Sequence, residues 1–186
     1  MRIALIGTIV AAAVTLVAPA SSQTPQRDLA AQRAAMAKLD ALKGRWLGLA
    51  ERNTPDGKTY TFTQTMIVQP HASGLVMTIE GKSIRHSGGF EVEQPRDGSF
   101  AVVTFDDRAA AYEFRSFGFG EVVPAKAELV TPATFRWTAA AGPAMLRFTI
   151  DLSKPGVWNE LGQRSSDGGK TWQTTNRLIA HRVEAR

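Results

Sequence analysis

The chain has 186 residues and a formal net charge of +5, from 22 basic and 17 acidic side chains. It contains no cysteine, which excludes disulfides, thiolate nucleophiles, cysteine-based metal sites and the N-terminal lipid anchor of bacterial lipoproteins. The basic residues are scattered along the chain rather than grouped, so the charge does not indicate a nucleic-acid partner.

Residues 1–20 have the pattern of a signal peptide. Met1 and Arg2 give a short positive start, residues 3–17 form an uncharged and mostly apolar run, and Ala18-Pro19-Ala20 offers an A-x-A cleavage site. The run is shorter than the roughly 20 apolar residues that a membrane span needs. The sequence therefore predicts a bacterial protein that is exported to the periplasm or secreted, with no stable membrane anchor after cleavage.

Residues 21–43 read as a disordered tip followed by one helix. A helical pattern extends from Pro25 to Lys43, with Thr24 as the capping residue and Gly44 as the end. One side of this helix is apolar and carries Leu29, Met36, Leu39 and Leu42. We expect the helix to pack on the domain that follows, because amphipathic helices mostly bury their apolar stripe. A lid or partner-binding segment is the alternative.

After Gly44 the apolar period changes from helical to two residues, which indicates strands in a single domain over residues 44–186. About ten short strands separated by turns are typical of an antiparallel barrel or sandwich. The strand candidates are 45–51, 59–69, 75–81, 90–94, 99–105, 110–117, 126–131, 133–139, 144–152, 156–165 and 171–181. Turn-forming residues gather at 70–74, 87–89 and 95–98. A meander of hairpins favours an all-β, antiparallel up-and-down barrel over a Greek-key sandwich.

Residues 134–151 are expected to form a hairpin that turns at Ala141-Gly142-Pro143. The symmetric register about this turn pairs Phe135 with Phe148, Trp137 with Leu146, and Arg136 with Arg147. We expect the aromatic face to point into the barrel and the two arginines to point out, with Glu128 close enough to offset their like charges.

The same alternation predicts which large side chains face the barrel interior and would line a ligand site. They are Tyr60, Phe62, Met66, Met77, Phe114, Phe135, Trp137, Phe148 and Trp158. A barrel of this size either fills with such side chains or encloses one small ligand, and a lining of methionine and aromatic residues suits an apolar molecule.

Ser165 to Trp172 is a turn sequence between two strands. Asp167, Gly168 and Gly169 are residues that favour tight turns and positive φ, and Trp172 begins the next strand. The octet fits Ser-x-Asp-x-Gly-x-Thr-Trp and resembles the Asp-box of sialidases and other β-proteins, where it is a structural turn. A tight hairpin here would place Glu160 opposite Arg177, either as an exposed ion pair or as a ligand-reading pair inside the barrel.

Gly44-Arg45-Trp46 stands where the first strand begins, and this G-x-W resembles the start of the lipocalin and calycin barrels. The chain is similar to a group of uncharacterised secreted bacterial proteins that open with G-x-W-x-G and close with a D-G-G-x-T-W hairpin. The resemblance implies that Trp46 closes one end of the barrel and that an arginine from the last strand, Arg177 or Arg182, lies across it.

No catalytic motif is apparent in the sequence, which lacks a G-x-S-x-G nucleophile elbow and histidine spacings that hold a metal. His71, His86 and His181 are expected at the surface. A haem-binding barrel of the nitrobindin type would use His71 or His86 as its axial ligand, but we expect no metal and no cofactor.

Three functions are compatible with these features. The first is a non-catalytic, lipocalin-like protein that binds a small apolar or amphipathic molecule. The second is an enzyme of isomerase or cyclase type that uses a Tyr, Glu or Arg inside the barrel. The third is an accessory protein with a filled core that binds a protein partner.

Overall fold

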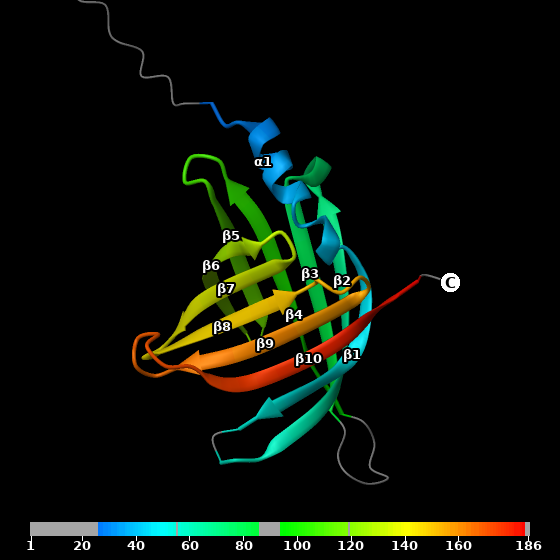
Figure 1. Ribbon diagram of the computed structural model, residues 1–186, viewed down its shortest axis with the longest axis vertical. Helices are drawn as coiled ribbons and strands as arrows, with labels where there is room; N and C mark the ends of the chain where they lie inside the picture. Colours follow the sequence, from blue (N-terminus) through cyan, green and yellow to red (C-terminus); the bar gives the residue numbers. More distant parts are fainter. Residues whose placement is uncertain (1–25, 55, 86–93, 119, 185–186) are drawn as a thin grey trace, which may run out of the picture.

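The computed structural model describes residues 26–54, 56–85, 94–118 and 120–184, which form an antiparallel ten-stranded barrel preceded by one α-helix (Figure 1). The expected fold class is therefore confirmed. The strands are β1 (Gly44–Asn53), β2 (Thr59–His71), β3 (Val76–Arg85), β4 (Gln94–Asp106), β5 (Ala111–Gly118), β6 (Glu121–Thr131), β7 (Thr134–Ala141), β8 (Ala144–Asp151), β9 (Val157–Ser165) and β10 (Gln173–Val183). Each strand pairs with its sequence neighbours, and β1 pairs with β10 to close the barrel. The predicted signal peptide, tip residues 21–25 and His86 lie outside the described residues.

The N-terminal segment covers one end of the barrel (Figure 1). It forms α1 (Leu29–Ala37) and the 3-10 helix η1 (Asp40–Leu42). Met36, Leu39 and Leu42 are buried against the barrel core, whereas Leu29 is exposed, contrary to expectation. The Tyr112 hydroxyl donates a 2.7 Å hydrogen bond to the Ala35 carbonyl and fixes the helix to β5. This segment therefore packs on the domain as predicted, and it closes the end opposite the β1–β2 turn.

The helix begins later than predicted, with Asp28 as its cap, and the predicted cap Thr24 lies outside the described residues. The Asp28 carboxylate accepts hydrogen bonds from the backbone N–H groups of Ala30 and Ala31. Asp107, in the turn between β4 and β5, accepts further bonds from the Asp28 backbone and from the Gln32 side chain. These bonds hold the pKa of the Asp107 carboxyl well below its usual range. Within the described residues, no helix has the length and apolar character that crossing a membrane requires.

The G-x-W-x-G segment of β1 makes the contact that closes the barrel. Trp46 is buried and its indole Nε1 donates a 2.9 Å hydrogen bond to the Leu42 carbonyl. Arg182 on β10 lies over the Trp46 ring at 4.4 Å, so Arg182 rather than Arg177 is the arginine across this tryptophan. Two positions further along β1, Gly48 faces Ala180 of β10.

Gly48 is required by how closely β10 approaches. A Cβ atom added at Gly48 would lie 2.1 Å from the Ile179 carbonyl oxygen and 2.4 Å from the Ala180 Cα, and backbone atoms cannot move aside cheaply. We predict that Gly48→Ala lowers the free energy of unfolding by about 1–3 kcal/mol, the usual cost of overpacking. Urea denaturation measures it. Leu49→Ala, on the exposed face of the same strand, is the control and should cost far less; equal losses would contradict the close-contact explanation.

One sequence prediction about a turn is wrong. Pro95–Gly98 is not a turn but part of β4, which continues through it with a shift in register against Gly81 and Ser83 of β3. The one extra residue on β4 is absorbed as a bulge, a feature that turn-forming residues also accommodate. The candidate strand at 90–94 lies outside the described residues except for Gln94, which begins β4.

The pairing register of the β7–β8 hairpin also differs from the prediction, by two residues. It turns on Gly142 and Pro143 alone, with Ala141 paired to Ala144, so Trp137 faces Phe148 and Phe135 faces Ile150. Gly142 has a φ of 60°, which suits the first central position of a two-residue hairpin turn. A shift of two residues leaves each side chain on the same face of the sheet. The arginines therefore still lie outside, where Arg136 contacts Glu128 at 3.4 Å and Arg147 binds Gln163.

The predicted pairing of Glu160 with Arg177 is wrong. An irregularity between Thr174 and Asn176 shifts the β9–β10 register by one residue, and Glu160 then faces Leu178. A one-residue shift exchanges the faces of a strand, so Arg177 lies on the outer face while Glu160 points inward. The same shift places Trp158 opposite Ala180.

Candidate functional site

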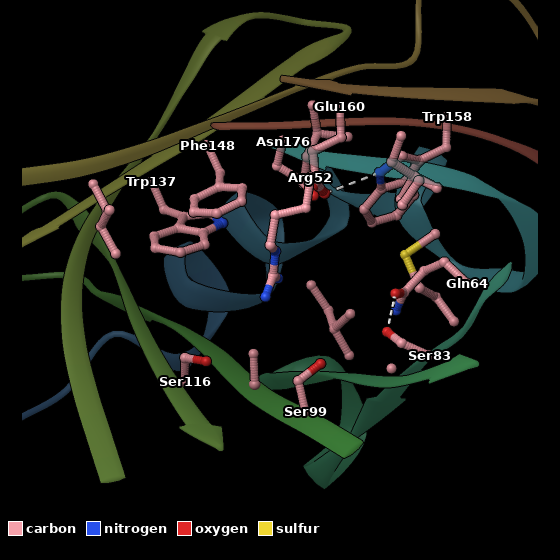
Figure 2. A pocket seen from close by; sticks show the side chains of 18 of the residues that line it. Arg52, Gln64, Ser83, Ser99, Ser116, Trp137, Phe148, Trp158, Glu160 and Asn176 are labelled. Carbon is pink, nitrogen blue, oxygen red and sulfur yellow. Dashed lines mark hydrogen bonds between the residues drawn. The ribbon is translucent and has the colours of Figure 1, made fainter. Parts of the chain in front are cut away.

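The barrel encloses a cavity of about 320 Å³ to which every one of its ten strands contributes side chains. This volume lies at the lower end of the roughly 300–1,000 Å³ that is usual for small-molecule sites. Figure 2 shows that Trp137 and Phe148 lie together on one side of the cavity and Trp158 on the opposite side, with polar side chains between them. The barrel core is therefore not filled.

The aromatic side of the cavity is a stack of three rings. Trp137 lies nearly parallel to Phe148, with ring centroids 4.3 Å apart and an interplanar angle of 12°, and to Phe114 at 4.8 Å and 10°. Gly162 on β9 makes room for this stack, since an added Cβ would be 2.7 Å from Phe148 Cε1. Trp137 and Phe148 point inward yet are only partly buried, because part of their surface faces the cavity.

Small polar side chains form a second part of the wall, on β2 to β5. The Ser83 hydroxyl donates a hydrogen bond to the Gln64 side-chain carbonyl, and Ser99 and Ser116 continue the polar surface (Figure 2). Gly81 leaves space for this group, because a Cβ there would approach Ser99 Oγ and Gln64 Nε2 within 3 Å. This surface offers neutral donors and acceptors.

Glu160 is the carboxyl group of the cavity wall. The Trp158 indole Nε1 donates a 3.2 Å hydrogen bond to Glu160 Oε2 (Figure 2). Burial raises the pKa of Glu160 to about 7, and the bond from Trp158 opposes that rise. The side chain keeps some accessible surface although it is enclosed by protein, because that surface faces the cavity. Glu160 therefore changes its charge near neutral pH in an otherwise largely apolar space.

Arg52 and Asn176 lie next to each other on β1 and β10, towards the open end of the barrel. Figure 2 shows the Arg52 side chain reaching into the cavity. Its guanidinium lies 5.7 Å from the centre of the Phe62 ring, and the residue is exposed. The cavity thus carries a solvated positive charge at its mouth and a carboxyl deeper in its wall.

The predicted interior residues divide into two groups. Phe62, Met66, Phe114, Trp137, Phe148 and Trp158 line the cavity. Met77 and Phe135 are buried in the core, and Tyr60 packs against that core, so these three do not belong to the cavity wall that the structure describes. Contact of any of them with a ligand stays a prediction.

The Ser165–Trp172 turn lies apart from the cavity wall. Asp167 accepts hydrogen bonds from the Lys170 and Thr171 backbones and from the Thr171 hydroxyl, which lowers its pKa to about 2. Gly169 has a φ of 89°, and its carbonyl accepts a bond from the Trp172 indole. Trp172 also packs under the Arg147 guanidinium at 3.9 Å. The Ser165–Trp172 motif therefore forms a turn that is stabilised by its own hydrogen bonds.

The two described histidines, His71 and His181, give no support to the haem alternative, and His86, its other candidate ligand, lies outside the described residues. His71 is exposed and binds the Thr78 hydroxyl at 2.9 Å, His181 is exposed on β10, and neither lines the cavity. Among the residues that the structure describes, no three His, Asp or Glu side chains come close enough together to hold a metal ion.

Sequence reasoning missed Arg52, Gln64 and Asn176 and did not settle on an interior Glu160. The signal was present in the alternation of two strands. Glu160 is two residues from Trp158, and Gln64 lies midway between Phe62 and Met66, so each shares a face with residues predicted to point inward. In a barrel sequence, polar residues on an otherwise apolar strand face indicate an interior site.

The closed antiparallel barrel, its capping N-terminal helix and the Trp46–Arg182 contact make up a lipocalin-like barrel fold. Solved structures agree at the level of the fold. Rv2717c from M. tuberculosis matches with a TM-score of 0.56 and 12% identity over 81% of this chain and 98% of its own. The S-type phycobiliprotein lyase CPES from Guillardia theta matches with a TM-score of 0.57 and 10% identity over 82% and 94%. No protein-family model and no curated protein matches the sequence.

Proposed function

We propose that this protein is an exported, lipocalin-like carrier or sensor that binds one small amphipathic molecule inside the barrel without converting it chemically. The observation that supports this most is the cavity of about 320 Å³ between the three-ring stack and the polar wall. Partly buried inward-facing rings lose accessible apolar surface when a ligand covers them, and that loss drives binding. The pattern of residues 1–20 supports export to the periplasm or medium.

Catalysis ranks below binding. Arg52 and Glu160 are the charged side chains on the described cavity wall. A guanidinium does not give up its proton in proteins, so Glu160 is the one of these two groups that can transfer a proton. Isomerase chemistry commonly combines a proton-transferring group with a second group that stabilises the developing charge. Glu160 can supply the first role, and it is the residue to replace if turnover of a bound molecule is found.

Blocking the cavity tests the proposed function. Ser99 points into the cavity from β4, whereas Thr104 is on the outer face of the same strand. We predict that Ser99→Phe weakens binding of 2-naphthylmethanol, a neutral bicyclic probe, by about tenfold or more in isothermal titration calorimetry, since steric misfit in an apolar pocket has effects of this size. Thr104→Phe is the matched control and should bind as the unaltered protein does. Equal affinities in all three proteins would show that the probe binds elsewhere.

A further inference from the structure

Glu160 has more capacity to accept hydrogen bonds than the surrounding protein uses. A carboxylate has about four acceptor positions. Among the described residues, the hydrogen bond to this carboxyl comes from the Trp158 indole. The strands on either side place Ile150 of β8 and Leu178 of β10 opposite Glu160, and neither can donate. On β8 and β10, therefore, no cationic side chain lies opposite the ionised Glu160 carboxylate. The carboxylate borders the cavity.

The aromatic stack lies next to this carboxyl on the same inner face. Phe148 of β8 is paired with Gly162, which is two residues from Glu160 along β9. Gly162 carries no side chain, and the Phe148 ring lies over it, so the ring and the Glu160 carboxyl border the same part of the cavity. A molecule in this part of the cavity would contact an aromatic ring with its body and a carboxylate with one end.

We propose that the molecule bound by this protein is a small protonated amine with an aromatic or otherwise flat apolar body, whose ammonium group meets the Glu160 carboxylate while its body packs along Phe148 and Trp137. This inference rests on the proposed binding function and specifies its ligand class. An ammonium group supplies the donors that Glu160 lacks, and its charge stabilises the ionised carboxylate, which burial disfavours.

Arg52 is the feature that would favour an anionic ligand instead. Its side chain reaches into the cavity, but the residue is exposed, so water screens its charge, whereas Glu160 is set in the wall opposite Ile150 and Leu178. A charge interaction grows stronger as the surroundings become less polar, which gives Glu160 the greater influence on ligand charge. The remaining polar side chains of the described wall, Gln64, Ser83, Ser99, Ser116 and Asn176, are neutral.

Three probes that share one ring system test this inference. They are 2-naphthylmethylamine, which is protonated at pH 8, the neutral 2-naphthylmethanol, and the anionic 2-naphthylacetate. Each is titrated calorimetrically at pH 8 into the unaltered protein and into Glu160→Gln, which has the same shape and can still accept the Trp158 hydrogen bond. We expect the amine to bind the unaltered protein about tenfold or more tightly than the alcohol, the range of effect of a charge-assisted hydrogen bond.

In Glu160→Gln the amine should bind no more tightly than the alcohol, and circular dichroism checks that the variant is folded. At pH 5.5, where Glu160 is protonated, the amine should lose its advantage in the unaltered protein too. Tighter binding of the acid, equal binding of amine and alcohol, or an amine advantage that persists in Glu160→Gln would overturn the inference and leave the binding function intact. Failure of all three probes to bind would overturn both.

Discussion

Replacing Trp46 with alanine should lower the free energy of unfolding by about 3–5 kcal/mol, the usual cost of removing a large aromatic side chain from a core. Trp46 is 2% exposed, and its ring meets Trp158 edge-on with centroids 5.5 Å apart. The substitution also removes the hydrogen bond to the Leu42 carbonyl and the ring beneath Arg182. Because these contacts join η1, β1, β9 and β10, their loss should loosen the closed end of the barrel.

Equilibrium unfolding in guanidinium chloride, followed by circular dichroism, measures this loss. Leu47→Ala is the matched control, since Leu47 is the next residue on β1 and is 44% exposed on the outer face. Its cost should stay near the small values typical of surface positions. A Trp46→Ala variant as stable as Leu47→Ala would contradict the role of Trp46 in closing the barrel.

Glu160 should make the protein less stable as pH rises through neutrality. Its pKa is about 7 in the folded state and 4.5 for the unperturbed side chain, so the folded state holds the proton more tightly than the unfolded state does. The contribution of Glu160 to stability is fully present below pH 4.5, declines as the pH rises from there, and is lost above pH 7. The difference corresponds to about 3 kcal/mol.

Glu160→Gln isolates this effect from the other titrating groups, because it removes the charge and keeps the shape. The variant should match the unaltered protein at pH 4 and exceed its free energy of unfolding by about 3 kcal/mol at pH 8.5. Urea titrations at a series of pH values measure the difference between the two proteins. A difference that does not change with pH would mean that Glu160 is hydrated well enough to keep an ordinary pKa.

The barrel was predictable because its strands carry strong local signals. Two-residue alternation, turn residues and the G-x-W start are set by short stretches of chain, and they led to the right architecture and to the right face of the 134–151 hairpin. The predicted register of that hairpin was wrong by two residues, but the prediction of which side chains point inward was still right, since alternation repeats every two residues.

The site was harder to predict because it depends on single-residue shifts and on groups far apart in the sequence. The irregularity after Thr174 moved the partner of Glu160 from Arg177 to Leu178, and nothing in the local sequence marks it. Gln64, Glu160 and Asn176 come together only when the barrel closes. Whether inward-facing rings fill a barrel or line a cavity depends on the sum of many side-chain volumes, which alternation alone does not reveal.

The proposed function requires that the barrel hold a small molecule. Native mass spectrometry of the protein purified from its own organism, compared with the same sample after denaturation, detects such a molecule. We predict a mass that exceeds that of the polypeptide by one small molecule, released on unfolding and absent from Ser99→Phe prepared in the same way. Identical masses before and after denaturation, together with no binding of the naphthyl probes, would contradict it.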